Sequence, residues 1–362
     1  MEKVRATRFL SSFANYGRSS RPLLSWRYVA PMLCVAAALL FGLLTTAAQD
    51  QTKQRETPAS RSPSPYWAFA VNPPVAADDH APKKDADVPQ HLPGSSATFT
   101  SAQLSDLFAA PDWHSDGHPP MPEAVARGRK PGLFACGYCH LPNGQGRPEN
   151  SSLAGLPADY IVEQIADFKN GLRKNRYPKL LPGAAMTALA ATASDAEVES
   201  AAKYFASLKP VPWIRVVETK SVPKTHVEGW MLVASSPART EPIGRRIIET
   251  PVDLEQTELR NDRSGFIAYL PIGSIKAGEA LVTSGGAGRT LPCASCHGPQ
   301  LTGLGNIPSI AGRSPSYIVR QLYNIQRGDR TGPAVRVMQP VVAKLTSNDI
   351  LSIAAYTSSL HP

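Results

Sequence analysis

The sequence predicts a mainly α-helical protein with two duplicated domains, a β-rich insert between them and a disordered N-terminal linker. Three observations support this fold class: an internal repeat, helical periodicity of apolar residues in both copies, and β-branched runs between the copies. With 362 residues, of which 42% are hydrophobic, the chain is long enough for two cored domains, and a wholly disordered protein is excluded.

Two segments at the N-terminus indicate export. Residues 1–28 form a basic leader, and residues 29–48 form an uncharged apolar stretch. At about 1.5 Å of rise per residue, a helix over that stretch would span about 30 Å, the thickness of a bilayer core. It is either a membrane anchor or a cleaved signal peptide, because Thr46-Ala47-Ala48 resembles a signal-peptidase site. In both cases the positive flank stays cytoplasmic and everything after residue 48 is exported.

Residues 49–119 are rich in Pro, Ser, Ala and Asp and show little apolar periodicity, so we expect a disordered linker. The formal net charge of the chain is +9, but residues 1–28 contribute 6 − 1 = +5, which leaves 9 − 5 = +4 for the exported part. This surplus is too small to indicate a nucleic-acid-binding surface.

An internal repeat defines the two domains. Residues 136–171 and 293–328 align without a gap at an offset of 157, and after a five-residue deletion the alignment continues at an offset of 152. We therefore expect one domain at 120–210 and a second at 273–362. Both read as helical because their apolar residues recur at helical spacing.

Helix ends and strands are also indicated. Ser194-Asp195 and Ser347-Asn348 lie where helix N-caps are expected, and Pro210 and Pro362 follow the last helix of each copy. Between the copies, residues 211–272 contain four β-branched or aromatic runs, from which we expect strands. These runs are WIRVVETK, GWMLVA, RRIIET and GFIAYLP.

Each copy contains one Cys-x-x-Cys-His motif. The six residues are Cys136, Cys139 and His140 in the first copy and Cys293, Cys296 and His297 in the second. The spacing is that of a c-type haem attachment site, in which two thiols bond to the porphyrin and the histidine ligates the iron. Zinc held by four thiolates and a redox-active dithiol are the competing interpretations. An adjacent histidine in both copies of an exported chain favours two covalently bound haems.

The sixth iron ligand is predicted from the positions of two methionines. Met186 is the only methionine between Cys139 and Pro210, and Met338 is the only one after Cys296. They occupy equivalent positions in the two copies, so we expect both to ligate iron. A thioether ligand raises the reduction potential and leaves no open position for dioxygen or peroxide.

Both copies resemble the small class I cytochrome c domain, and the pair resembles the dihaem cytochrome c4 and c553-like family. The matching features are the two motifs, an Ala-Gly before a Tyr-Ile-Val-x-Gln helix, the methionine, and a tyrosine in the final helix. The resemblance covers 120–210 and 273–362. It implies a periplasmic electron carrier with two haem c groups and says nothing of the insert.

The resemblance implies further site residues. The carbonyl of Pro308 is expected to orient His297. The equivalent position in the first copy is Ser151, which leaves the orienting group of the first haem open and allows the two potentials to differ. The aligned Arg173 and Arg330 are expected to hydrogen-bond haem propionates, the alternative being solvated arginines in a turn.

These expectations combine into one function, the transfer of single electrons between respiratory partners. The donor would be a quinol-side complex or a dehydrogenase, and the acceptor a terminal oxidase or reductase. No substrate is transformed, so we do not expect an enzyme. A cytochrome subunit of a membrane dehydrogenase or oxidase complex is one alternative, and a dihaem peroxidase, which needs an open iron, is another. Residues 29–48, if uncleaved, would tie the protein to the inner membrane.

Overall fold

The structure, a computed structural model, describes most of the chain after residue 64. The described ranges are 65–73, 87–174, 181–236 and 239–362. They belong to one compact unit, Ser62–Pro362. The expected leader and apolar stretch at residues 1–48 lie outside the described residues. Within the described ranges, every helix is too short or too polar to cross a bilayer.

Five described helices build the region of residues 120–210, called the first half below. They are α3 (Glu123–Ala126), α4 (Cys136–His140), α5 (Ala158–Lys169), α6 (Leu181–Thr192) and α7 (Asp195–Ser207). Val125, Ile161 and Phe205 are buried together in its core. The expected N-cap of α7 is confirmed: Ser194 accepts from the N–H of Glu197, whose carboxylate accepts in return from the N–H of Ser194.

Residues 273–362, the second half, contain a matching set of helices. They are α9 (Ser274–Ser284), α10 (Ala294–His297), α11 (Pro315–Arg327), the 3₁₀ helix η4 (Pro333–Met338), α12 (Gln339–Val342) and α13 (Ser347–Ser359). Helices α9 and α13 approach so closely that a Cβ at Gly278 would overlap the carbonyl oxygen of Ser352. The N-cap of α13 is Thr346 rather than the expected Ser347, because the Thr346 hydroxyl accepts from the N–H of Asp349.

The helices of the two halves recur at the offsets of the sequence repeat. Helices α5 and α11 begin at residues 158 and 315, which is an offset of 157, and α7 and α13 begin at residues 195 and 347, an offset of 152. The deletion falls between these pairs, where the 12-residue α6 is matched by the shorter η4 and α12. The two halves therefore present equivalent residues on equivalent elements.

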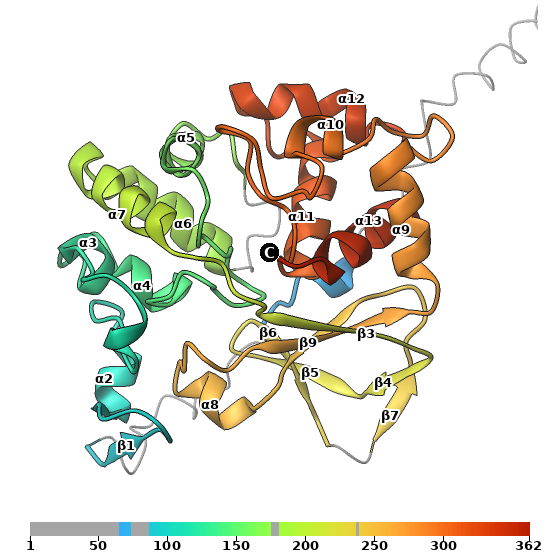
Figure 1. Ribbon diagram of the computed structural model, residues 1–362. Coiled ribbons are helices and arrows are strands. Elements are labelled where there is room, and N and C mark those ends of the chain that lie inside the picture. The colour runs from blue at the N-terminus through green and yellow to red at the C-terminus, as the bar shows by residue number, and fades with distance from the viewer. Residues whose placement is uncertain (1–64, 74–86, 175–180, 237–238) are drawn as a thin grey trace, which may run out of the picture. The chain divides into compact units, whose positions relative to one another are not determined.

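The segment between the halves, residues 211–272, contains strands β3 to β9, most of which are labelled in Figure 1. They are β3 (Ile214–Thr219), β4 (Ser221–Pro223), β5 (Thr225–Glu228), β6 (Met231–Ala234), β7 (Thr240–Pro242), β8 (Ile248–Pro251) and β9 (Phe266–Pro271). Strand β9 pairs parallel with β3 and antiparallel with β8, while β4–β7 and β5–β6 are antiparallel pairs. Helix α8 (Leu254–Glu258) lies between β8 and β9 in the chain.

The structure differs from the linker expected at 49–119 wherever it describes that range. Its elements there are η1 (Tyr66–Ala68), β1 (Pro89–His91), β2 (Thr98–Thr100), α2 (Ser101–Ser105) and η3 (Ser115–Gly117). Leu92, Leu104 and Trp113 are buried together, and the Trp113 indole donates to the carbonyl of Leu259 over 2.6 Å. Sparse apolar residues leave no local period in the sequence, yet they gain burial against elements that are distant along the chain.

Candidate functional site

The first motif forms a single helical turn, α4, which places its two thiols together. Cys136 and Cys139 lie three residues apart on this helix, so their side chains share one face. The chain leaves the helix at Leu141, whose φ of 63° turns the backbone away. The second motif forms the equivalent turn α10, with Cys293 as its N-cap. Local helical geometry is therefore enough to present each Cys pair to one side.

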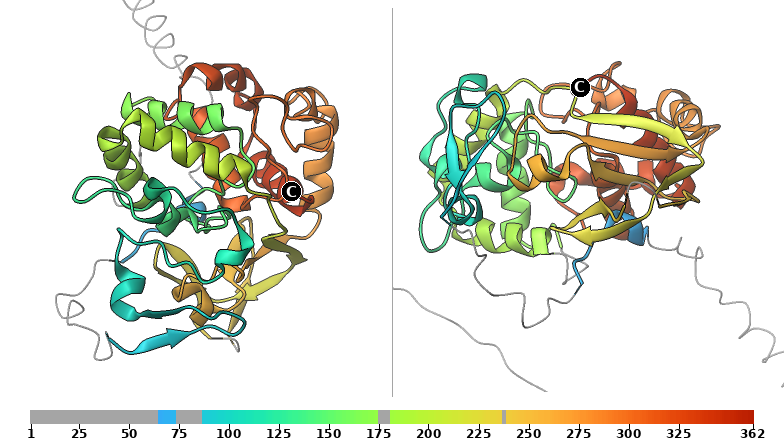
Figure 2. Two further views of the ribbon diagram at one scale, coloured as in Figure 1. Left: turned by 60° about the vertical axis from the view of Figure 1, so that its left-hand side comes forward. Right: turned by 90° about the horizontal axis from the view of Figure 1, so that it is seen from below.

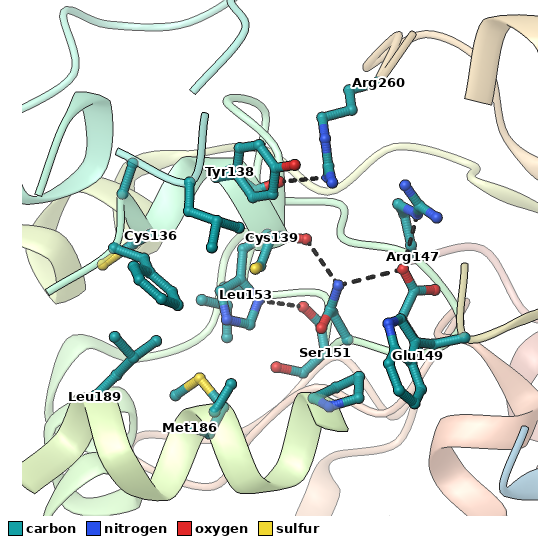
Figure 3. Close-up of a pocket in the computed structure, with 18 of the residues that line it drawn as sticks. Cys136, Tyr138, Cys139, Arg147, Glu149, Ser151, Leu153, Met186, Leu189 and Arg260 are labelled. Carbon is teal, nitrogen blue, oxygen red and sulfur yellow. Dashed lines mark hydrogen bonds and ion pairs between the residues drawn. The ribbon is translucent and has the colours of Figure 1, made fainter. Parts of the chain in front are cut away.

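A cavity of about 1010 Å³ opens beside α4. Its walls include Cys136, Cys139 and His140 from α4 and Met186 from α6. In Figure 3, Met186 and Leu189 project from one helix toward the side of the cavity where the two cysteines lie. Although Met186 is 46 residues beyond His140 (186 − 140), the fold brings two thiols, an imidazole and a thioether to one space.

His140 is held in place by the backbone. The side chain is 7% exposed, and its Nδ1 lies 2.8 Å from the carbonyl oxygen of Ser151. Burial lowers the pKa of His140, so the ring is neutral, with Nδ1–H donating and Nε2 left as an electron-pair donor. The group that orients His140 is thus the main-chain carbonyl of Ser151, at the repeat position equivalent to Pro308. Serine can replace proline at this position because the acceptor belongs to the main chain.

The second motif has the same arrangement around its histidine. His297 is 8% exposed, and its Nδ1 lies 2.8 Å from the carbonyl oxygen of Pro308, the residue named by the resemblance. Met338 is half-buried at the end of η4 and packs against the same apolar cluster as Cys293. The structure therefore joins His297 to Pro308 and packs Cys293 and Met338 against one apolar cluster.

The thiols are poor candidates for dithiol or zinc chemistry. Burial raises the pKa of Cys136 to about 12 and that of Cys293 to about 11, whereas redox-active cysteines need a lowered pKa. Among the described residues, which include all four motif cysteines, no three His, Cys, Asp or Glu side chains are grouped so that they could hold a metal ion. The cysteines are better suited to covalent attachment of a cofactor.

The two arginines singled out in the sequence meet at the contact between the halves. Arg173 and Arg330 form an isolated antiparallel β-bridge. The Gln321 side-chain oxygen accepts from Arg173 (3.0 Å) and Arg330 (3.3 Å), and that of Gln164 accepts from Arg330 (2.7 Å) and Arg173 (3.3 Å). Gln164 and Gln321 occupy equivalent repeat positions. Sequence reasoning missed their role, although the shared Tyr-Ile-Val-x-Gln motif was the available signal.

Buried polar atoms without a hydrogen-bond partner also occur at this contact. They include Nε2 of Gln164, which lines the cavity, and Nε of Arg330. Arg330 is 7% exposed, and its guanidinium also donates to the hydroxyl of Tyr160 over 3.0 Å. Since buried donors are normally satisfied, Nε2 of Gln164 is available to an acidic group that enters from the cavity, and Arg330 lines a smaller pocket that shares His140 and Met186 with it.

The cavity fits a haem with propionate groups. Its volume is at the upper end of the range of about 300–1,000 Å³ usual for ligand pockets, and apolar side chains from α5, α6 and α7 form much of its wall. The motif thiols lie at one part of this wall and the unpaired amide of Gln164 at another. A flat apolar ring with two attachment points and acidic substituents matches this donor set.

Part of the wall comes from a segment that sequence reasoning did not connect with the site. Met231 at the start of β6, and Leu259 and Arg260 directly after α8, line the same cavity. The local sequence carries no signal for this, because the contact depends on how the segment packs against α4.

Known c-type cytochromes are similar to the chain over much of its length. The thiosulfate dehydrogenase electron acceptor of Thiomonas intermedia is 26% identical over 234 residues, which covers 63% of this chain and 80% of that protein. Cytochrome c4 of Pseudomonas aeruginosa is 26% identical over 231 residues, 62% of this chain and 84% of that one. Cytochrome c-554(547) of Halothiobacillus neapolitanus is 35% identical over 85 residues, 20% of this chain and 93% of that one. No family model matches the chain.

Proposed function

The chain belongs to the cytochrome c family that includes cytochrome c4, whose members carry electrons, and from this premise we propose that it carries single electrons through two covalently bound haems. The proposal rests on one observation above all. Cys136, Cys139, His140 and Met186 line a single cavity of haem size, and the second half repeats the motif, the buried histidine and the methionine.

Each half would hold one haem with equivalent residues. Cys136 and Cys139 would form the thioether bonds of the first, and His140 and Met186 would ligate its iron. Cys293, Cys296, His297 and Met338 would take these roles in the second. When bound, each haem supplies an iron that changes between the ferrous and ferric states by one electron.

The protein groups around each histidine set its basicity and orientation. The carbonyls of Ser151 and Pro308 accept from Nδ1 of His140 and His297 and so keep Nε2 unprotonated as the ligand atom. The thioethers of Met186 and Met338 favour the ferrous state and raise the potential. Gln164 and Arg330 would bind propionates at the contact between the halves, since each has a buried donor without a partner, and Arg173, which lines the cavity, would join them.

We assign 120–210 and 273–362 to the two haem domains of a duplicated fold and 211–272 to a β-rich insert between them. Export by residues 1–48 would place both haems in the periplasm, with residues 29–48 either cleaved or anchoring the chain in the inner membrane. The partners would be a redox donor, such as a quinol-side complex or a dehydrogenase, and an oxidase or reductase as acceptor. A dehydrogenase donor is supported by the relative named thiosulfate dehydrogenase electron acceptor.

Haem content and ligand spectra of the exported protein test the proposal. We expect two haems per chain, the weak far-red absorption of thioether-ligated ferric iron, and no consumption of hydrogen peroxide. Met186→Ala and Met338→Ala should each remove about half of the far-red absorption and open one iron to added cyanide. Met121→Ala, which changes a methionine that packs in the first-half core, is the matched control and should leave the absorption intact.

Other outcomes would overturn the proposal. One haem per chain would refute the duplication of the site. Unchanged absorption in both alanine variants would refute methionine ligation. Rapid peroxide turnover by the unaltered protein would favour a dihaem peroxidase, for which a methionine that lines the cavity is an obstacle.

The second candidate function is a dedicated subunit of a membrane dehydrogenase or oxidase complex, which the same named relative favours. Purification from native membranes in mild detergent separates the two functions. Stoichiometric recovery with a flavin-, quinone- or molybdenum-containing partner would favour the subunit. A free cytochrome would favour the shuttle.

A further inference from the structure

The segment 211–272 contributes a wall to the first cavity on the side of the cysteines. Glu228, Trp230 and Met231 line the cavity from the β5–β6 turn, and Leu259 and Arg260 line it from the end of α8. Arg260 and Tyr138 lie next to each other in Figure 3, above the two cysteines. The first motif is therefore covered by an element that the repeat itself does not contain.

Arg260 is the residue of this wall that contacts the motif directly. Its guanidinium carbon lies 3.6 Å from the centre of the Tyr138 ring, and its Nη1 donates to the Tyr138 carbonyl over 2.8 Å. Tyr138 is one of the two residues between the motif cysteines. The backbone of Arg260 has a φ of 60°, a left-handed conformation that arginine rarely adopts. Such a conformation persists only where surrounding contacts hold it.

The charge of Arg260 is less compensated than that of its neighbour Arg147. Arg147 is paired with Glu149 at 2.8 Å, and both side chains are less than a tenth exposed. The direct contacts of Arg260 are with an aromatic ring and a main-chain carbonyl, which carry no net charge. Glu149 also acts on Arg260 across space but is paired with Arg147, and the other carboxylates on this wall, Glu228, Glu255 and Glu258, are exposed to solvent. Because a guanidinium stays protonated in proteins, Arg260 keeps a positive charge beside Cys139.

The second motif lacks the partner that such a contact requires. At the offset of 157, Ser295 is the equivalent of Tyr138, so no aromatic ring is present there. Ser295 and Cys296 are exposed, whereas Tyr138 is 7% exposed. Arg289, four residues before Cys293, is paired with Asp349 at 2.5 Å. The two motifs therefore differ both in cover and in the charge beside them.

Another buried cation, Arg313, contacts both halves. It donates to the carbonyl of Ser309 in the second half and to those of Ser152 and Ala154 in the first. These residues flank the carbonyls that hold the two histidines. Arg313 thus lies between the two halves, whereas Arg260 contacts the first motif alone.

We propose that α8 and Arg260 cover the cysteine side of the first haem site and hold a fixed positive charge there, which makes the reduction potential of the first haem the higher of the two. This inference rests on the proposed function. A nearby positive charge disfavours the oxidised state, which carries one more positive charge than the reduced state. Exclusion of water by α8 lowers the local dielectric response and strengthens that effect. Arg260 acts here on the electrostatics of the site and is not a ligand.

An optical redox titration of the full-length holoprotein tests the inference. The unaltered protein should titrate in two waves, and Met186→His identifies the wave of the first haem because it changes that iron's ligand. Arg260→Leu should lower the first potential and narrow the gap between the waves. Arg260→Lys, which keeps the charge, should restore most of the gap. Arg263→Leu is the matched control, since Arg263 follows in the same loop but has half of its side chain exposed and pairs with Asp116.

The outcomes separate this inference from the function on which it rests. Two haems with unchanged waves in Arg260→Leu would overturn the inference and leave the proposed function intact. A lower potential for the first haem in the unaltered protein, or an equal shift of both waves in Arg260→Leu, would also overturn it. A single haem per chain would overturn the proposed function itself. Circular dichroism and haem content of each variant show whether a change in potential is accompanied by unfolding.

Discussion

The first and second halves share an order of helices but complete their structures by different means. The second half opens with α9, an 11-residue helix that packs along α13 through Gly278. The first half opens with α3, which has only four residues. Its neighbourhood is extended by residues 87–119 and by α8, which meet through the Trp113 hydrogen bond to Leu259. The second half is thus completed by an intrinsic helix, and the first half by segments from elsewhere in the chain.

This difference concerns function as well as stability. Figure 2 shows the blue-green segment that begins at residue 87 beside the gold segment that contains α8. The cover of the first motif comes from the segment that also carries the strands, and the second motif leaves Ser295 and Cys296 exposed. Duplication alone would produce two equivalent electron sites. In the proposed carrier, the added segments would make the two haem sites unequal in cover and in nearby charge.

The largest loss of stability is expected from Gly278→Val, which disrupts the packing of α9 against α13 in the second half. The new side chain would overlap the Ser352 carbonyl, so α9 and α13 would have to separate. We expect a loss of at least about 4 kcal/mol of unfolding free energy, measured by denaturant titration of the holoprotein. Ala277→Val, on the exposed face of the same helix, is the control. Equal stability of the two variants would contradict close α9–α13 packing.

A somewhat smaller loss of stability is expected from Trp113→Ala, which disrupts the contact of residues 87–119 with the end of α8. The indole is 3% exposed, stacks edge-on against Phe99 and donates to Leu259. Its removal should cost about 3–4 kcal/mol, because a large cavity and an unpaired carbonyl remain. Tyr66→Ala, with a ring that is 74% exposed, should cost little. An unchanged melting curve for Trp113→Ala would restore the linker interpretation of this segment.

The smallest effect is a pH dependence at the contact between residues 87–119 and α7. The hydrogen bond to Asp112 raises the pKa of His118 above its usual 6.5, and Tyr204 of α7 contacts the same ring at 3.0 Å. Folding therefore favours the protonated ring. The resulting stability is complete below the unfolded pKa and is lost as pH rises through the folded one. His118→Gln should cost up to about 1 kcal/mol at pH near 6 and less at pH near 9.

The measurement is the unfolding free energy of the unaltered protein and of His118→Gln, each at pH near 6 and at pH near 9. His226→Gln, which alters an exposed histidine paired with Glu228, controls for the general effect of losing an imidazole. A loss that is the same at both pH values would show that His118 acts through packing alone.

Much of the candidate site could be predicted because its residues follow one another at short, fixed spacing in the sequence. A Cys-x-x-Cys-His motif brings two thiols to one helix face whatever the rest of the fold does, and the repeat pairs Met186 with Met338 by position alone. Helix ends followed the same logic: the cap at Ser194 was predictable from its side chain. The cap at Thr346 was missed by one residue because two adjacent hydroxyl residues can serve equally well.

The linker interpretation failed at residues 87–119 for the opposite reason. Trp113 and Leu104 lie in a stretch of low apolar periodicity, and their burial depends on partners such as Leu259, 146 residues away from Trp113. Apolar periodicity is read from short stretches of sequence, so it does not reveal contacts between residues that lie far apart along the chain.

The sequence by itself therefore determined the duplication, the attachment motifs, the candidate axial ligands and the helical character of both halves, since each depends on spacing within a few tens of residues. Tertiary structure alone decided that Arg173 meets Arg330, that the Ser151 carbonyl holds His140, and that Arg260 lies on Tyr138. Those contacts join residues from different elements, and their geometry follows from how whole elements pack.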